Sequence, residues 1–494
     1  MLRIYSRWPA FLLATFSGGL LVSAFAPLAW WPVVFLASGM LILLWQDASP
    51  KHAFWLGYGF GLGLFGIGAS WVYNSIHVFG QAPVWVAAIL TILFVAVLAL
   101  FPALTGWFQS RFFQNAKLVR LVIVIPALWV LFEWLRGWVF TGFPWLYLGN
   151  TQLETPLKNI VPITGVLGAT WLVMLITGLL VYSLVARKNN RWLSILAVIM
   201  IVVISWSLGK INWIEKTNST LKVTLVQGNI SQENKWKPEW LMPTLKRYND
   251  LTVAHWDSDL IVWPEVAIPG YYKNFEKAFL DPLALEARKN KTDILLGALY
   301  FENEKAYNSI VKIGDGFGVY KKRHLVAFGE YIPFREYLGW LDGLIVLPAS
   351  DMDKSDEPTV LQAAGEKFSS SICYEDAYGH EMADMLPEAT LLLNISNDAW
   401  FGDSLAPHQH LEIARMRSVE LGRDLLRANN TGITAFIDHR GQVKQTAPQF
   451  EVTTLTDTVQ PRTGSTPFVI WKNKALVFAM FILLLFGYFA GKKK

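Results

Sequence analysis

Eight long apolar stretches constrain this 494-residue chain more than any other feature of its sequence. A helix that crosses the hydrocarbon core of a bilayer needs about 20 predominantly apolar residues. Charged residues make up only 16% of the chain, whereas soluble globular chains carry about 25%. The sequence therefore predicts a polytopic α-helical membrane protein with eight transmembrane helices. We expect these helices at residues 11–26, 32–45, 54–73, 84–108, 121–140, 166–186, 192–208 and 475–489.

The distribution of lysine and arginine predicts the orientation of these helices, because positive residues are enriched in short cytoplasmic loops. They occur at both ends of the chain and after the second, fourth and sixth stretches, whereas the alternate loops carry almost none. We therefore expect both termini in the cytoplasm and the long segment after the seventh stretch on the outer face. The residues used are Arg3, Arg7, Lys51, Arg111, Lys117, Arg120, Arg187, Lys188, Arg191, Lys492, Lys493 and Lys494.

Much of the net charge of +5 belongs to cytoplasmic loops, so we expect no nucleic-acid partner. The first apolar stretch has a basic start, as a signal peptide does, but six further stretches and the lack of a clear A-x-A pattern predict that it is retained.

Residues 212–467 differ from the rest of the chain, because they hold most of the charged residues and alternate between strand-like and helix-like patterns. We expect one α/β domain here, a membrane domain at 1–211, and a last helix with a basic cytoplasmic tail at 468–494. The strand candidates are 222–227, 260–263, 293–300, 309–313, 368–374, 390–396, 434–438 and 453–458, and the helix candidates are 239–255, 274–289 and 410–427.

Ionisable side chains follow hydrophobic strand candidates in this domain. Glu265 ends the segment LIVWPE, Lys322 begins a run that reaches Glu330, and Cys373 lies in SSICYE. A thiol has an ordinary pKa of about 8.5 and needs a base or a nearby cation before it attacks a carbonyl. A carboxylate can take the proton, and an ammonium can stabilise the thiolate and the oxyanion. Together these residue types indicate acyl transfer, whereas each alone has an ordinary structural interpretation.

We expect neither a metal nor a cofactor. Cys373 is the single cysteine, so the chain forms no intrachain disulfide and no multi-cysteine metal site. His408 and His410 are two residues apart, which places them on different faces of a helix, and no third ligand is evident nearby. No glycine-rich phosphate loop is visible either.

The segments that carry Glu265, Lys322 and Cys373 occur in the order of the Glu–Lys–Cys signatures of the nitrilase, or carbon–nitrogen hydrolase, superfamily. The α/β domain therefore resembles that superfamily. Further similar segments are NISNDAWFG at 394–402, PHQH at 407–410 and NNTG at 429–432. The resemblance implies an α-β-β-α sandwich. One departure is Ala327, where proline is usual, and it bears on the rigidity of the loop between Lys322 and Glu330.

The apolar stretches make the whole chain similar to the membrane-bound branch of this superfamily that N-acylates lipoproteins at the bacterial inner membrane. The segments EWLRGW at 133–138 and TGFPW at 141–145 also match that branch. The resemblance implies a periplasmic catalytic domain, a phospholipid acyl donor and a diacylated apolipoprotein acceptor. It implies that Cys373 carries the acyl chain as a thioester, that Glu265 is the general base, that Lys322 stabilises the oxyanion, and that Glu330 orients Lys322 or assists proton transfer.

The same resemblance suggests residues that bind substrate. Trp236, Tyr374, Glu375 and Trp400 match positions near the thiol in that branch, and packing is the alternative role for the two tryptophans. Glu133 and Arg136 are intramembrane charges, which are often functional, and a structural pair that braces the helices is the alternative.

Two other functions remain open from the sequence. A membrane-tethered amidase or nitrilase would use the same triad with water as the second nucleophile. A transporter with an inert outer domain would leave the triad without a purpose, and no pair of broken helices in repeated halves supports it.

Overall fold

The computed structural model describes residues 7–113, 117–185, 188–338 and 351–492. The chain divides into two compact units. Unit one comprises residues 1–73, 84–212 and 471–494, and unit two comprises residues 74–83 and 213–470. The segment 74–83, between the third and fourth apolar stretches, therefore belongs with the α/β domain. Four residues of the orientation prediction, Arg3, Arg187, Lys493 and Lys494, lie outside the described residues.

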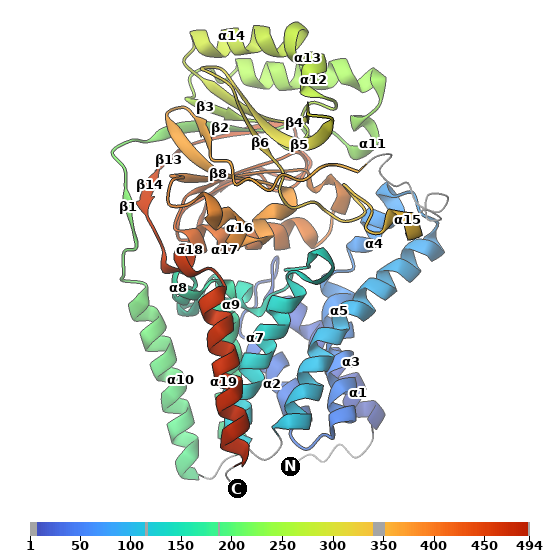
Figure 1. The fold of residues 1–494 in the computed structure, drawn as a ribbon, viewed down its shortest axis with the longest axis vertical. Coiled ribbons are helices and arrows are strands. Elements are labelled where there is room, and N and C mark those ends of the chain that lie inside the picture. The colour runs from blue at the N-terminus through green and yellow to red at the C-terminus, as the bar shows by residue number, and fades with distance from the viewer. Residues whose placement is uncertain (1–6, 114–116, 186–187, 339–350, 493–494) are drawn as a thin grey trace. The chain divides into compact units, whose positions relative to one another are not determined.

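Unit one consists of apolar helices (Figure 1). Helix α3 packs against both α1 and α5, and small residues allow close approach. A Cβ atom at Gly63 would lie 1.9 Å from the Thr15 carbonyl oxygen, and one at Gly57 would lie 2.3 Å from that of Pro102. The bounds are α1 Arg7–Leu21, α2 Val33–Trp45, α3 Pro50–Gly68, α4 Val72–Asn74, α5 Val84–Phe112, α6 Lys117–Val119, α7 Ile125–Arg136, α8 Val161–Thr164, α9 Val166–Val185, α10 Lys188–Leu208 and α19 Lys474–Lys492.

Each of the eight apolar stretches contains an apolar helix, but the helices differ in length. Among the described residues, four helical segments are long and apolar enough to cross a membrane: 84–112, 117–136, 166–185 and 191–208. A fifth counts if α3 and the helical segment after it, bent by 59°, form one span. Three more apolar helices, at 8–24, 33–45 and 474–490, are shorter. The number of membrane crossings therefore stays a prediction.

The fifth apolar helix ends earlier than predicted. It stops at Arg136 instead of residue 140, and the chain continues into a 3-10 turn, Val139–Thr141. Phe140 and Thr141 in this turn have φ angles of 52° and 75°, which are incompatible with a continuing helix.

Glu133 and Arg136 bond to segments that follow their helix. The Glu133 carboxylate accepts hydrogen bonds from the Leu148 N–H at 3.0 Å and the Thr170 hydroxyl at 2.8 Å. The Arg136 guanidinium donates to the Trp145 carbonyl oxygen at 2.5 Å. These bonds tie α7 to α9 and to the chain between them, so they favour the structural interpretation of both charges.

Within the described residues, unit two contains two six-stranded sheets and one two-stranded sheet. The first sheet has the order β13-β2-β3-β4-β5-β6, and the second has the order β12-β11-β10-β9-β8-β7. Strands β2, β3 and β4 are parallel, as are β8, β9 and β10, and the flanking strands are antiparallel. Both sheets are therefore mixed. The bounds are β1 Ile214–Lys216, β2 Leu221–Gln227, β3 Leu260–Val262, β4 Asp293–Glu302, β5 Lys305–Ile313, β6 Gly318–Lys321, β7 Leu361–Ala363, β8 Glu366–Ile372, β9 Leu391–Ser396, β10 Leu425–Asn429, β11 Ala435–Ile437, β12 Val443–Thr446, β13 Thr453–Val459 and β14 Arg462–Gly464.

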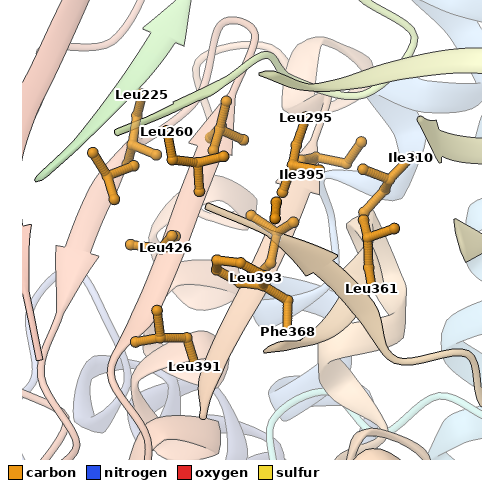
Figure 2. Close-up of a cluster of buried hydrophobic side chains, with 14 of the residues drawn as sticks. Leu225, Leu260, Leu295, Ile310, Leu361, Phe368, Leu391, Leu393, Ile395 and Leu426 are labelled. Atoms are coloured by element: carbon orange, nitrogen blue, oxygen red, sulfur yellow. The ribbon is translucent and has the colours of Figure 1, made fainter. Parts of the chain in front are cut away.

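The two sheets pack face to face around one apolar core (Figure 2). Leu260 of the first sheet and Phe368 and Leu393 of the second are fully buried there. Because alternate residues of a strand point to opposite faces, Ile261 and Trp263 lie in a separate cluster on the outer face of the first sheet.

Helices cover the outer faces of both sheets. Leu245 of α12 and Leu283 of α14 pack on the first sheet, and Ala414 of α17 packs on the second. The structure thus shows the α-β-β-α sandwich that the resemblance implies (Figure 1). The bounds are α11 Gln232–Lys235, α12 Pro238–Val253, α13 Tyr272–Phe275, α14 Asp281–Lys289, α15 Arg335–Leu338, α16 Gly379–Met382, α17 Ala406–Leu421 and α18 Pro467–Trp471.

The predicted helix at 410–427 is wrong at both ends. Helix α17 begins at Ala406 and ends at Leu421, because Gly422 adopts the left-handed conformation at φ 67°, which commonly terminates helices. Residues 425–429 then form strand β10 in the middle of the second sheet.

Candidate active site

Cys373 occupies a sharp turn directly after strand β8. The strand ends at Ile372, and a 3-10 helix, Cys373–Ala377, begins at the cysteine. Cys373 has φ 53°, a left-handed conformation that a side-chain-bearing residue adopts only at a cost of about 1–2 kcal/mol. Such a turn aims the thiol away from the strand, and the cost indicates that the surrounding structure fixes it.

Glu265, Lys322 and Glu330 form a compact charged cluster in unit two. The Lys322 ammonium lies 2.9 Å from the Glu330 carboxylate and 3.6 Å from Glu265 Oε1. Glu265 follows β3, Lys322 follows β6, and Glu330 follows in the next loop. Strands β3 and β6 both run parallel to β4, so their carboxyl ends lie at one edge of the sheet.

Asn308 joins the two carboxylates of this cluster. Its side-chain amide donates to Glu265 Oε1 at 2.8 Å and to Glu330 Oε1 at 2.9 Å. The backbone carbonyl oxygen of Asn308 accepts a hydrogen bond from the backbone N–H of Lys322 at 2.8 Å. Sequence reasoning missed Asn308. The sequence offers no clear signal for it, because β5 (KAYNSIVKI) also carries the polar residues Lys305, Ser309 and Lys312.

The charges of the cluster act on the thiol in opposite senses. Burial and then Glu265 raise the pKa of Cys373 well above its usual value, and Lys322 opposes them. The thiol is therefore protonated at rest and needs a base. Burial lowers the pKa of Lys322, but Glu330 and Glu265 outweigh it and raise that pKa. Lys322 is thus a permanent ammonium beside the thiol.

Lys235 is a second ammonium near the thiol, and sequence reasoning missed it. It ends α11, is 4% exposed, and donates from Nζ to the Glu265 carbonyl oxygen at 3.1 Å. Burial lowers the pKa of Lys235 to about 8, against the opposing charges of Glu265 and Cys373. It lies immediately before Trp236, a residue that the sequence does single out.

Glu375 holds the cysteine turn against the loop of Lys322. Its carboxylate accepts from the N–H groups of Ile372, Arg323 and His324 at 2.7, 2.6 and 2.9 Å, and from the Tyr320 hydroxyl at 3.0 Å. Burial raises the pKa of Glu375 to about 7, whereas Lys322 and the three N–H groups favour the ionised form. Glu375 is 2% exposed, so its burial and its contacts favour a structural role that links these segments over the predicted contact with substrate.

The other three predicted substrate residues are more open. Trp236 is 53% exposed and Trp400 is 37% exposed. The Trp400 ring lies 5.8 Å from that of Phe79, and the Trp400 carbonyl oxygen accepts a hydrogen bond from the Ser75 hydroxyl at 2.9 Å. Segment 74–83 therefore supports the turn that carries Trp400.

Tyr374 follows the nucleophile and is half-buried. Its ring lies 5.4 Å from that of Tyr378 and 6.2 Å from that of His324. The structure thus brings Cys373 together with Glu265, Lys322 and Glu330, and it places Tyr374 beside the same loop.

Comparisons with known proteins match both the membrane part and the α/β part of the chain. A family model described as "Apolipoprotein N-acyltransferase N-terminal domain" matches residues 17–179, and one described as "Carbon-nitrogen hydrolase" matches residues 222–468. Proteins named apolipoprotein N-acyltransferase are similar over nearly the whole chain. The one from Methylococcus capsulatus is 45% identical over 94% of this chain and 92% of its own length. Those from Vibrio cholerae and Coxiella burnetii are each 40% identical, over 94% and 96% of this chain and 94% and 99% of their own lengths. The chain therefore belongs to the apolipoprotein N-acyltransferase family.

Proposed function

We propose that this protein transfers the sn-1 acyl chain of a phospholipid to the N-terminal α-amine of a diacylglyceryl-cysteine on an apolipoprotein, through a thioester at Cys373. This transfer is the final step of lipoprotein maturation. The observation that carries the proposal is a buried thiol on a left-handed turn whose strongest charged neighbours are Glu265 and Lys322. That arrangement supplies a nucleophile, a base and an oxyanion partner for acyl exchange.

In the first step, Glu265 takes the thiol proton and the Cys373 sulfur attacks the ester carbonyl. Both Lys322 and Asn308 contact Glu265 on Oε1, which leaves Oε2 to take the proton. Lys322 stabilises the oxyanion of the tetrahedral intermediate. The carbon–sulfur bond forms, the ester carbon–oxygen bond breaks, and the lysophospholipid leaves with the proton from Glu265.

In the second step, the α-amine of the acceptor attacks the thioester. Glu265 takes a proton from the attacking nitrogen, Lys322 again stabilises the oxyanion, and the carbon–sulfur bond breaks as the amide forms. The proton on Glu265 returns to the Cys373 sulfur, so the enzyme is regenerated. Glu330 keeps the Lys322 ammonium in place through their 2.9 Å contact.

The substrates are both anchored in lipid, so the reaction needs a site at a membrane surface. We propose eight membrane crossings in unit one, cytoplasmic termini, and a periplasmic catalytic domain at the bacterial inner membrane. The domain boundaries that we propose are 1–211, 212–467 and 468–494.

Three aromatic side chains near the thiol are suited to contact the acyl chain or headgroup. They are the half-exposed rings of Trp236 and Trp400 and the neighbouring Tyr374.

The acyl-transfer proposal is tested with a diacylated lipopeptide and a phospholipid that carries a labelled sn-1 chain. The purified protein should convert the lipopeptide to its labelled triacylated form, and Cys373→Ala and Lys322→Met should not. Release of the label as free fatty acid, with no triacylated product, would instead show that water is the second nucleophile, and a lack of any reaction with phospholipid would favour the amidase alternative.

The proposed topology is tested separately. A reporter that is active only outside the cytoplasm, fused after Leu208, should be active, and the same reporter fused after Phe112 should be silent. The opposite pattern would overturn the periplasmic placement of the catalytic domain.

A further inference from the structure

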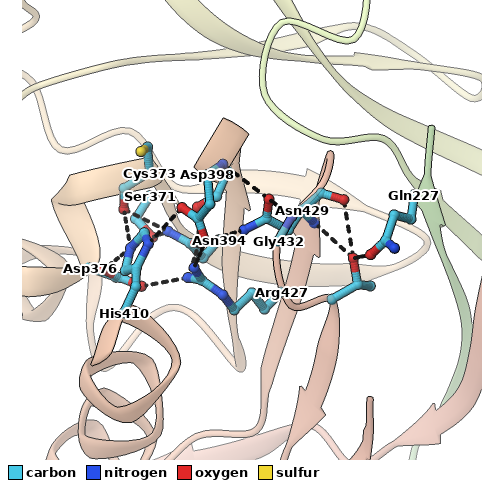
Figure 3. A network of polar contacts seen from close by, with 12 residues as sticks. Gln227, Ser371, Cys373, Asp376, Asn394, Asp398, His410, Arg427, Asn429 and Gly432 are labelled. Carbon is cyan, nitrogen blue, oxygen red and sulfur yellow. Dashed lines mark hydrogen bonds and ion pairs between the residues drawn. The ribbon is translucent and has the colours of Figure 1, made fainter. Parts of the chain in front are cut away.

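A buried network of charges lies directly behind the nucleophile (Figure 3). The Cys373 carbonyl oxygen accepts a hydrogen bond from the Asn394 amide at 3.1 Å and lies 3.3 Å from His410 Nε2. The same Nε2 lies 3.0 Å from Asp376 Oδ1, and Nδ1 lies 2.9 Å from Asp398 Oδ1. His410 therefore connects the cysteine turn to two carboxylates.

The contacts of His410 fix its charge state. Each ring nitrogen faces a carboxylate oxygen, and an ionised carboxylate only accepts hydrogen bonds, so both nitrogens carry hydrogen and the ring is an imidazolium. Arg427 binds the second oxygen of each carboxylate, Asp376 Oδ2 at 3.0 Å and Asp398 Oδ2 at 3.2 Å. The charges of His410 and Arg427 thus balance those of the two aspartates. All four of these side chains are at most 1% exposed. A neutral His410 would leave one buried negative charge unbalanced, which is costly.

The electrostatic environment agrees with this assignment. Burial and Arg427 lower the pKa of His410, but Asp376 and Asp398 outweigh them and raise it to about 9. Burial raises the pKa of Asp398, but His410 and Arg427 hold it below its usual value. The imidazolium is therefore the form present at neutral pH.

The turn at Cys373–Ala377 is also fixed at the residue before the cysteine. Glu375 accepts the Ile372 N–H at 2.7 Å, which fixes the chain before Cys373. The left-handed Cys373 needs a second anchor after its Cα atom, because rotation of the next peptide plane would redirect the thiol. His410 and Asn394 are the side chains that bind that peptide plane through the Cys373 carbonyl oxygen.

We infer that His410 is a positioning residue for the acyl-transfer reaction: as an imidazolium held between Asp376 and Asp398, it shares its Nε2–H with the Cys373 carbonyl oxygen and so aims the thiol at the acyl carbonyl. This inference rests on the proposed role of Cys373 as the nucleophile. His410 acts through the backbone of Cys373 and does not touch substrate.

Two isosteric variants separate positioning from folding. The side-chain amide of Gln reaches the place of His Nε2, and that of Asn reaches the place of His Nδ1. His410→Gln therefore keeps a donor near the Cys373 carbonyl oxygen, whereas His410→Asn keeps one only near Asp398. His408→Gln on the same helix is the matched control, because His408 lies two residues away and is half-buried.

The measurement is the single-turnover rate of Cys373 acylation by phospholipid, together with the melting temperature of each variant. A displacement of about 1 Å can slow an enzyme step about 100-fold, so we expect that loss for His410→Asn and about tenfold or less for His410→Gln. The phospholipid KM and the His408→Gln rate should stay within about twofold of wild type. Equal rates for the Asn and Gln variants, or losses that only track the folded fraction, would overturn the inference.

A measurement on the wild-type protein keeps the test independent of variant folding and of acyl transfer. In protein labelled with 15N in its eight histidines, the His410 ring, assigned by its absence in His410→Gln, should show two protonated nitrogens at pH 7.5. A neutral His410 ring at that pH would refute its role as an imidazolium between Asp376 and Asp398. If the ring is an imidazolium but phospholipid does not acylate Cys373, only the proposed function is refuted.

Discussion

Replacing Glu375 by glutamine should destabilise unit two. The Glu375 carboxylate accepts four hydrogen bonds, and an amide cannot accept all of them because one of its ends is a donor. Oε1 faces two backbone N–H groups, those of Arg323 and His324, and Oε2 faces the Ile372 N–H and the Tyr320 hydroxyl. In the less costly orientation of the glutamine amide, its NH2 group takes the place of Oε2, where the Tyr320 hydroxyl can rotate and accept a hydrogen bond from it. The Ile372 N–H then loses its acceptor.

The magnitude follows from these contacts. Orphaning one buried donor costs about 1–3 kcal/mol, and the remaining bonds weaken because they are no longer charge-assisted. Removal of the buried charge, whose cost raises the pKa of Glu375 to about 7, offsets part of this loss, so we expect a net loss of about 2 kcal/mol in the free energy of unfolding. For a unit of this size, 1 kcal/mol of stability corresponds to about 2–4 °C, so the melting temperature should fall by about 6 °C.

The assay is thermal unfolding of wild type, Glu375→Gln and the control Glu366→Gln. Glu366 accepts hydrogen bonds from the Ser219 and Thr390 hydroxyls at 2.6 and 2.7 Å, and both hydroxyls can rotate to suit an amide. The control should melt within about 2 °C of wild type. If Glu375→Gln melts with the control but loses its acylation rate, the structural role of Glu375 is refuted and contact with substrate is favoured.

Two further predictions concern residues near the nucleophile. Asn308→Ala removes two hydrogen bonds to carboxylates and should slow Cys373 acylation about 100-fold, or about 3 kcal/mol, at unchanged phospholipid KM; a wild-type rate in single-turnover kinetics would contradict this. The pKa of His410, about 9 in the folded protein, exceeds the unfolded value of about 6.5, so its contribution to stability is complete below about pH 6.5 and is lost as the pH rises through about 9. The gap in melting temperature between wild type and His410→Gln should therefore narrow between pH 6 and pH 9, by the equivalent of about 3 kcal/mol, and a constant gap would count against the raised pKa.

Sequence periodicity and motif order predicted much of this molecule. The apolar stretches contain apolar helices, and the strands at 222–227, 293–300 and 390–396 lie within one or two residues of their predicted ends. Family membership confirms the predicted lipoprotein N-acyltransferase. The helix predicted at 410–427 is too long because apolar and charged residues continue at helix-like spacing past Gly422, the residue that ends α17, into strand β10.

Other parts of the site depend on contacts between distant segments. Asn308 looks like an ordinary strand residue until β5 and β6 place it between Glu265 and Glu330. Lys235 reads as one more surface lysine until its ammonium is buried against Glu265. His410 belongs to the similar segment 407–410 and is a poor metal-ligand candidate in the sequence, but no sequence pattern shows that Asp376 and Asp398 reach it from two separate 3-10 helices.

The thioester mechanism is tested by detecting the acyl group on Cys373 itself. Protein incubated with phospholipid labelled in its sn-1 chain, without acceptor, should become labelled, and neutral hydroxylamine should release the label. Peptide mass spectrometry should place the acyl group on Cys373, the single cysteine of the chain. Equal labelling of wild type and Cys373→Ala, or label that hydroxylamine does not release, would contradict the thioester mechanism.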